Sequence, residues 1–127
     1  MSGLRTRPTI LIVDDELGIR NMLVEILSLE GYPTETAANG QEALQRLSDG
    51  RPRVVLLDLA MPVMNGYATL AALEQDPAER QRHHIILISA LERLEAAKDL
   101  QVEGRLVKPF TVEQLLNTIG PYVQKVS

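Results

Sequence analysis

The stretch "VVLLDLAMPVMNG", from Val54 to Gly66, decides the fold class, because four branched apolar residues run directly into one carboxylate, Asp58. An uninterrupted apolar run of this kind is typical of a strand that is buried on both faces of a parallel sheet. A lone acid where such a strand ends points to a role in chemistry. The stretch therefore predicts a buried strand whose carboxyl end carries a functional carboxylate.

The rest of the chain alternates between short apolar runs and segments with helical periodicity. The expected strands are Thr9–Val13, Pro33–Ala37, Val54–Leu57, Ile85–Ile88 and Arg105–Val107. The expected helices are Glu16–Glu30, a short helix after Asn39-Gly40, Tyr67–Leu73, about Glu92–Leu100, and a last helix that Thr111 caps. Asp76-Pro77 is expected to break the helical pattern after the third of these helices. Because the connections are too long for hairpins, we expect an α/β fold, a (βα)5 doubly wound five-stranded parallel sheet with helices on both faces.

The bulk composition limits the classes of protein that fit. The chain has 127 residues, 45% hydrophobic and 24% charged, which is enough for one globular domain. A net charge of −4 without a basic tract argues against direct binding of nucleic acid. The absence of cysteine excludes disulfides and thiolate metal sites, and no apolar run is long enough to span a membrane. We expect a cytoplasmic protein with a flexible tail at residues 1–7 and one domain at residues 8–127.

Polar residues follow the carboxyl ends of four expected strands. Asp14 and Asp15 follow the first strand, Asp58 the third, Ser89 the fourth and Lys108 the fifth. In open parallel sheets the carboxyl ends of the strands meet at one edge, where ligands bind. Three carboxylates in one place repel each other unless a cation offsets their charge, and Mg²⁺ with oxygen ligands is the cation that fits best.

This constellation suits phosphoryl transfer. The carboxylate of Asp58 can attack phosphorus and form an acyl phosphate. The metal and the ammonium group of Lys108 would neutralise charge on the phosphoryl oxygens, and the hydroxyl of Ser89 would hydrogen-bond one of them.

Four motifs in this order, "LIVDDE", "LLDLAMPVMNG", "LISA" and "LVKPF", resemble the receiver domain of bacterial two-component response regulators. The resemblance covers about Pro8 to Val123. It implies a flavodoxin-like sheet of strand order 2-1-3-4-5 and Mg²⁺ as cofactor. It also implies a sensor histidine kinase or phosphotransfer protein as the phosphoryl donor, and a downstream effector protein or output domain as the receiver of the signal.

The resemblance also implies a role for each matching residue. Asp58 would be the phosphoacceptor. Asp15 would bind the metal directly, Asp14 would reach it through water, and Ala60 would offer it a backbone carbonyl. Lys108 would contact the phosphate, and Ser89 would supply the hydroxyl that moves to the phosphate when the domain switches. The bond from Lys108 to Pro109 is cis in the family.

Two features depart from the family pattern. Arg105 occupies a position that is usually Tyr or Phe, and we expect its charge to stay outward or to pair with an acid. The segment from Ser89 to Lys108 is about three residues shorter than usual by the same resemblance. A short or displaced fourth helix is therefore predicted.

Other readings of these residues stay open. Asp14 and Asp15 alone could cap a helix, and Glu16 fits a helix N-terminal charge better than a ligand. His83 and His84 fit solvated loop histidines better than metal ligands, because adjacent residues at a strand start point to opposite faces.

The chain could be a degenerate receiver that docks a partner without phosphorylation. A flavodoxin-type cofactor binder or an Asp-nucleophile phosphatase would need motifs that differ from "DDE". A stand-alone protein and an excised domain look alike.

Overall fold

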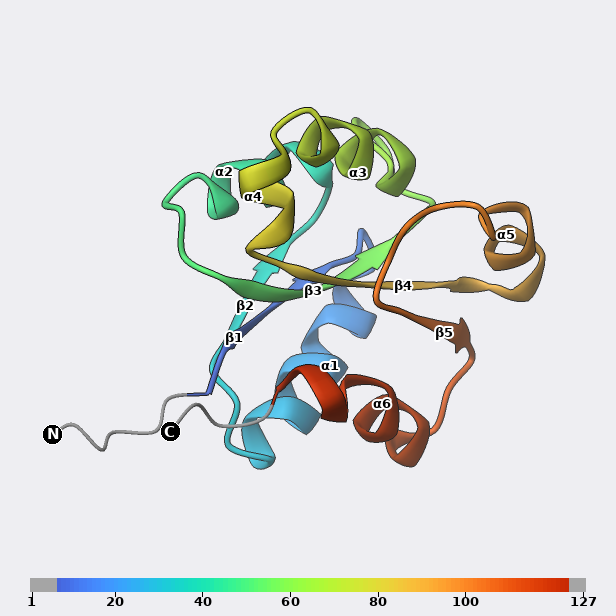
Figure 1. Ribbon diagram of the computed structural model, residues 1–127. Helices are drawn as coiled ribbons and strands as arrows, with labels where there is room; N and C mark the ends of the chain where they lie inside the picture. Colours follow the sequence, from blue (N-terminus) through green and yellow to red (C-terminus); the bar gives the residue numbers. More distant parts are fainter. Residues whose placement is uncertain (1–6, 124–127) are drawn as a thin grey trace, which may run out of the picture.

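Five parallel strands form one sheet in the order β2-β1-β3-β4-β5 (Figure 1). The computed structural model describes residues 7–123 of the chain. The strands are β1 (Thr9–Val13), β2 (Thr34–Ala37), β3 (Arg53–Asp58), β4 (His84–Ala90) and β5 (Gly104–Lys108). The predicted doubly wound parallel sheet and its strand order are confirmed. The polar strand β2 lies at one edge, as the strand order implied by the resemblance requires, and β5 lies at the other.

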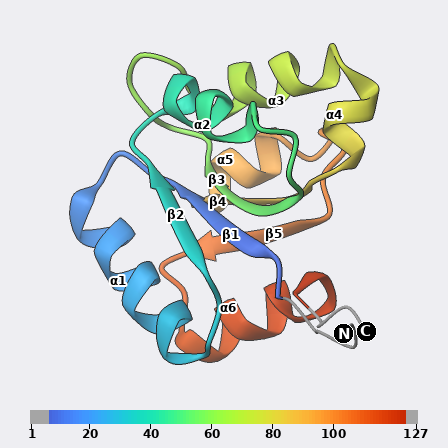
Figure 2. The same cartoon turned by 90° about the vertical axis from the view of Figure 1, so that its left-hand side faces the viewer.

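Helices cover both faces of the sheet, as Figures 1 and 2 show from two directions. α1 (Leu17–Leu29) and α6 (Val112–Ile119) lie on one face, and η1 (Gly120–Tyr122) follows α6. α2 (Gly40–Leu47), α3 (Gly66–Glu74) and α5 (Leu91–Ala96) pack on the other face, and α4 (Pro77–Gln81) follows α3.

Two separate hydrophobic cores result from the alternation of side chains along the strands. Leu11 and Val55 belong to the core under α2, α3 and α5, whereas Ile10 and Val54 belong to the core under α1 and α6. All six residues of β3 are buried. The central strand is therefore held from both sides up to its last residue, Asp58.

The short helix α4 is a correction to the sequence analysis. The predicted break at Asp76-Pro77 is confirmed, because α3 ends at Glu74, but a second short helix that the sequence did not predict follows it. The side chain of Asp76 accepts a hydrogen bond from the amide of Glu79, and Pro77 occupies the first turn of this helix. Proline is favourable there because its fixed φ suits a helix and its missing N–H would have no partner.

The predicted short fourth helix of the βα repeat is confirmed as α5, which has six residues and ends at Ala96 rather than near Leu100. The guanidinium of Arg105 lies outward, and its Nη2 is 3.2, 3.3 and 2.8 Å from the carbonyl oxygens of Ala97, Lys98 and Leu100. Arg105 thus adds a donor to carbonyl groups after the end of α5, one of which, that of Ala97, also accepts from the amide of Leu100. Its partners are backbone carbonyls and not an acid.

The expectation that both adjacent histidines are solvated is wrong for His83. His84 is exposed, but His83 is 1% exposed and lies beneath α4. Its Nδ1 accepts a hydrogen bond from the amide of Arg53 at 3.1 Å, and its Nε2 lies 2.9 Å from Oε1 of Glu79. The sequence gives no sign of these partners because both come from other elements.

Residues 1–6 of the predicted N-terminal tail lie outside the described residues. Arg7 places its guanidinium over the ring of Tyr32, 4.5 Å from the ring centroid, and donates a hydrogen bond to the carbonyl of Glu30. Between residues 7 and 123, none of the helices combines the length and the apolar character needed to cross a membrane.

Candidate functional site

Three carboxylates meet at the carboxyl ends of β1 and β3. Val13 of β1 is in register with Leu57 of β3, so the residues that follow lie side by side. Asp14, Asp15 and Asp58 each offer a carboxylate oxygen, and these oxygens lie within 4.8 Å of one another. The predicted convergence of the three acids is thus observed, although the residues are up to 44 positions apart in the sequence.

A single ammonium group lies between the two buried acids of this cluster. Nζ of Lys108 is 2.8 Å from Oδ2 of Asp14 and 3.2 Å from Oδ2 of Asp58. Oε1 of Glu16 is farther away, at 4.0 Å, and its side chain is mostly exposed. Lys108 ends β5 and precedes Pro109 with a cis peptide bond, as the resemblance implied.

Backbone amides hold the other oxygen of each buried acid. Oδ1 of Asp14 accepts a hydrogen bond from the amide of Glu16 at 2.9 Å, and Oδ1 of Asp58 accepts one from the amide of Ala60 at 3.1 Å. Asp14 and Asp58 are only 3% and 5% exposed. Both carboxylates are therefore fixed by the backbone on one side, while the other oxygen faces Lys108.

Burial raises the pKa of Asp58 above its ordinary value, and the neighbouring charge of Asp14 adds to this effect. The amide of Ala60 and the ammonium of Lys108 oppose it without cancelling it. Burial alone would lower the pKa of Lys108, but its hydrogen bond to Asp14 and the charges of Asp58 and Asp14 raise it. One ammonium against three carboxylates leaves two negative charges uncompensated. A divalent cation with oxygen ligands matches this deficit.

Ser89, near the end of β4, carries a polar atom without a partner. The residue is 1% exposed, and its Oγ is the one buried side-chain oxygen or nitrogen between residues 7 and 123 that has no hydrogen bond. A buried hydroxyl without a partner is costly and rare in folded proteins. The hydroxyl is thus available to a ligand that offers an oxygen acceptor.

Two glycines allow close packing, Gly66 against the backbone of Asp58 and Gly40 against the loop and helix that follow it. A Cβ on Gly66 would lie 2.4 Å from the carbonyl oxygen of Asp58, and a Cβ on Gly40 would lie 1.9 Å from Oγ1 of Thr69. The amide of Gly40 donates a hydrogen bond to the carbonyl of Met64 at 2.9 Å. The loop after Asp58 is thus pinned by the start of α2.

The sequence identified some of these residues and missed others. Gly66 was recognised as part of the loop after Asp58, but the close contacts of Gly40 could not be seen from the sequence. Arg20 was also missed: its Nη1 donates a hydrogen bond to the carbonyl of Asp14 at 2.6 Å. His83 and His84 lie at the opposite, amino end of β4 and take no part in the site.

Residues 10–120 match the family model of the response regulator receiver domain. The chain is 34% identical to sporulation initiation phosphotransferase F of Bacillus subtilis over 117 residues, which are 90% of this chain and 92% of that protein. Among solved structures, the chemotaxis response regulator CheY4 of Vibrio cholerae superposes with a TM-score of 0.80 at 34% identity, covering 91% of this chain and 98% of that one.

The response regulator TrrA of Thermotoga maritima, solved in complex with Mg²⁺-BeF, superposes with a TM-score of 0.77 at 32% identity and covers 90% of this chain and 97% of that one. The chain spans only 23% to 52% of several longer regulatory proteins that it also matches. With its sheet order, its acidic cluster and these matches, the chain belongs to the family of response regulator receiver domains, the phosphoaccepting modules of two-component signalling.

Proposed function

We propose that Asp58 is the phosphoacceptor of this receiver domain and takes its phosphoryl group from a phosphohistidine. The donor would be a sensor histidine kinase or a phosphotransfer protein. The observation that carries the proposal is the cluster of Asp14, Asp15 and Asp58, with Lys108 bridging its two buried members. A structural cluster would be expected to balance its charges, whereas this one has an excess of negative charge where a metal and a phosphoryl group would bind.

Asp14, Asp15, Asp58 and the backbone carbonyl of Ala60 would hold Mg²⁺, with Asp14 acting through water. When bound, the ion would neutralise negative charge on the phosphoryl oxygens. The donor set of carboxylates and a carbonyl, without sulfur or imidazole, suits this hard cation. The Mg²⁺-BeF complex of the related TrrA supports the same choice of metal.

The residues of the chain have distinct roles in the transfer. A carboxylate oxygen of Asp58 forms the bond to phosphorus while the bond from phosphorus to the donor imidazole nitrogen breaks, and the imidazole leaves. Lys108 offsets charge on the transferred group. The hydroxyl of Ser89 donates a hydrogen bond to a phosphoryl oxygen, which gives this buried group its missing partner. Water attacking the same phosphorus would break its bond to the Asp58 oxygen and release inorganic phosphate, so the reactions that the chain would catalyse are its own phosphorylation and dephosphorylation.

Exposed apolar side chains around the carboxyl ends of the strands support docking of a protein donor. Leu17 follows the acid pair, Val63 lies in the loop after Asp58, Leu91 follows Ser89, and Val112 follows Lys108, and all four are exposed. Apolar side chains gathered around a polar site are typical of a protein interface. Phosphorylation would then shift the population of two conformations that an effector protein or output domain distinguishes.

Phosphate-affinity electrophoresis tests the proposal. The purified chain is incubated with acetyl phosphate and Mg²⁺, beside a receiver domain that is known to be phosphorylated under these conditions. We expect a retarded species that EDTA and Asp58→Asn abolish, and that the matched exposed substitution Asp99→Asn leaves unchanged. Absence of a retarded species while the reference domain is modified, or an equal shift of Asp58→Asn, would contradict the proposal.

A phosphorylation-independent interaction module is the second candidate function. The bonds of Arg105 to the carbonyls after α5 favour it, because they tie β5 to this helix without any aromatic residue that could swing inward. The same electrophoresis decides between the two functions, since a degenerate receiver would give no retarded species.

A further inference from the structure

The amino ends of the strands form a second polar region at the opposite end of the sheet from Asp58. A hollow of about 380 Å³ lies there, and its polar and aromatic lining comes from Arg7, Arg51, Arg53, Arg82, His84 and Tyr122. No carboxylate lines the hollow among residues 7–123. Four of the 13 lysines and arginines of an acidic protein thus converge on one concave surface. Two of these arginines, Arg51 and Arg82, keep their side chains 74% and 42% exposed, and exposed guanidinium groups favour an anionic ligand.

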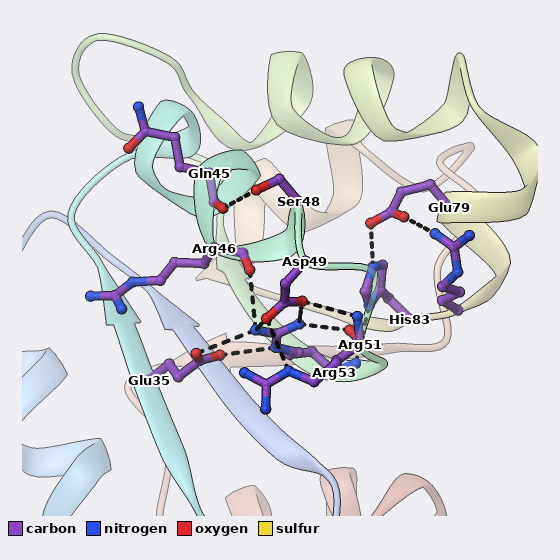
Figure 3. A network of polar contacts seen from close by, with 10 residues as sticks. Glu35, Gln45, Arg46, Ser48, Asp49, Arg51, Arg53, Glu79 and His83 are labelled. Carbon is purple, nitrogen blue, oxygen red and sulfur yellow. Dashed lines mark hydrogen bonds and ion pairs between the residues drawn. The ribbon is translucent and has the colours of Figure 1, made fainter.

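A polar network around Arg53, drawn in Figure 3, adjoins the hollow, whose lining includes Arg53. The side chain of Arg53 is 1% exposed. Its Nε lies 2.9 Å from Oε1 of Glu35, its Nη1 lies 2.5 Å from Oδ1 of Asp49, and its Nη2 donates to the carbonyl of Arg46 at 3.1 Å. His83 ties the amide of Arg53 to Glu79 of α4. β2, the end of α2, β3 and α4 are therefore locked together next to the hollow.

Two carboxylates of this network also orient the arginines at the rim. Asp49 accepts a hydrogen bond from Nε of Arg51 at 3.0 Å, and Glu79 forms an ion pair with Arg82. The side chains of Arg51 and Arg82 are nevertheless 74% and 42% exposed. A guanidinium has five N–H donors, so each of these arginines keeps several donors for a ligand. Positions fixed in advance reduce the ordering cost of binding.

The balance of charge at the hollow stays positive. Glu35, Asp49 and Glu79 are the carboxylates that pair with the arginines lining it. Arg7 contacts a ring and a carbonyl, and it pairs with no carboxylate in the described part of the chain. A purely structural set of ion pairs explains the buried Arg53. It does not explain why Arg7, Arg51 and Arg82 surround the same space.

One wall of the hollow is aromatic. The rings of His84 and Tyr122 lie with their centroids 5.0 Å apart at an interplanar angle of 37°. The hydroxyl of Tyr122 donates a hydrogen bond to the carbonyl of Glu103 at 2.8 Å, which fixes the orientation of its ring. A fixed aromatic surface beside guanidinium groups suits a ligand that combines a planar ring with negative charge.

We propose that this hollow binds a small phosphate monoester that carries a planar ring, with a mononucleotide as the simplest representative. Arg51 and Arg82 would contact the phosphate, and His84 with Tyr122 would contact the ring. The volume lies in the range of small-molecule sites. Since the hollow opens at the amino ends of β1, β3 and β4, binding would leave the acidic cluster accessible.

Isothermal titration calorimetry of the full chain with AMP, inorganic phosphate and adenosine, all in EDTA, tests this site. We expect AMP to bind more tightly than either of its parts, and its affinity to fall as ionic strength rises. Arg51→Ala and Arg82→Ala should each weaken AMP binding about tenfold. His84→Ala should weaken AMP binding without changing the affinity for phosphate.

Two controls separate this site from general charge effects and from the phosphoryl site. Arg93→Ala removes an exposed arginine on α5, away from the hollow, and should leave AMP binding unchanged. Asp58→Asn should also leave it unchanged, so the result is independent of the proposed phosphoacceptor. No heat with AMP, equal affinities for AMP and phosphate, or equal losses in Arg93→Ala and Arg82→Ala would each overturn the proposal.

Discussion

The charged groups at the two ends of the sheet differ in how completely they are paired. At the amino ends, the buried guanidinium of Arg53 has two carboxylates and two backbone carbonyls as partners. At the carboxyl ends, Lys108 bonds only Asp14 and Asp58 of the three clustered carboxylates, and the hydroxyl of Ser89 has no partner among residues 7–123. The comparison teaches that one end uses charge to hold segments together, while the other keeps an imbalance that a metal and a phosphoryl group would relieve.

Arg53→Met should cause the largest loss of stability. It removes a buried guanidinium and leaves Glu35 and Asp49 without their common partner. Breaking a buried ion pair from one side costs several kcal/mol, and we expect about 3 kcal/mol because both acids are partly exposed. Urea denaturation measures the loss, with the exposed Arg51→Ala as the matched control at roughly 0.5 kcal/mol or less. Equal losses for both variants would show that the network does not hold the amino end together.

Gly66→Ala tests the carboxyl end by displacing its central carboxylate. The new Cβ would lie 2.4 Å from the carbonyl oxygen of Asp58 and 2.8 Å from Cα of Leu59, so the backbone must move. We expect a loss of about 2 kcal/mol together with slower phosphorylation. Gly18→Ala is the control, since nothing lies within 4 Å of its Cβ position in α1. Both free energies come from thermal unfolding, and an unchanged rate in Gly66→Ala would argue against a strict placement of Asp58.

Asp58→Asn should stabilise the metal-free protein, by on the order of 1 kcal/mol. Because burial raises the pKa of Asp58 in the folded state, ionisation of this carboxyl opposes folding. The stability that its protonated form contributes is fully present below the unfolded pKa. It is lost as the pH rises through the folded pKa. The advantage of Asp58→Asn should therefore grow as pH rises from about 4.

Mg²⁺ should reverse this ranking, since it stabilises a folded state that binds it. We expect Mg²⁺ to raise the melting temperature of the wild type more than that of Asp58→Asn. Asp99→Asn, on an exposed carboxyl, should follow the wild type with and without the ion. A wild type that is more stable than Asp58→Asn without metal would mean that Lys108 already balances the cluster.

Asp49→Asn gives the opposite pH dependence at the amino end. The hydrogen bond to Arg53 holds the pKa of Asp49 well below its usual range, and the amide of Arg51 adds to this effect. A lowered pKa contributes stability that is fully present above the unfolded pKa, about 4, and is lost as pH falls. The destabilisation by Asp49→Asn should thus be greatest near neutral pH and should shrink in acid. Denaturant unfolding at several pH values measures it, and a constant difference would contradict the role of the ionised carboxylate.

The carboxyl end could be predicted from the sequence and the amino end could not. Asp14, Asp58, Ser89 and Lys108 each follow a recognisable strand, and parallel topology brings strand ends together. The buried Arg53 stands next to an apolar run, where it resembles an ordinary flanking charge. Only its distant partners reveal that it is inside the protein.

The dependence on partners that are distant in the sequence also explains other errors of prediction. His83 is buried because the amide of Arg53 in β3 and the carboxylate of Glu79 in α4 meet its two ring nitrogens, and His83 itself lies in the connection between α4 and β4. Asp76-Pro77 does end one helical segment, but the same residues cap and begin the helix α4, which the sequence analysis missed. Close backbone contacts such as those of Gly40 need the packing of α2 on α3, which local patterns do not give.

Chemical trapping of the modified residue tests the central claim most directly. The chain is treated with acetyl phosphate and Mg²⁺, reduced with borohydride, which converts an acyl phosphate to an alcohol, and digested for mass spectrometry. The imbalance of charge around Lys108 predicts that the aspartate reduced to homoserine is Asp58, and that omission of Mg²⁺ prevents its formation. Homoserine at Asp14 or Asp15, or equal formation at Asp58 without the metal, would contradict the claim.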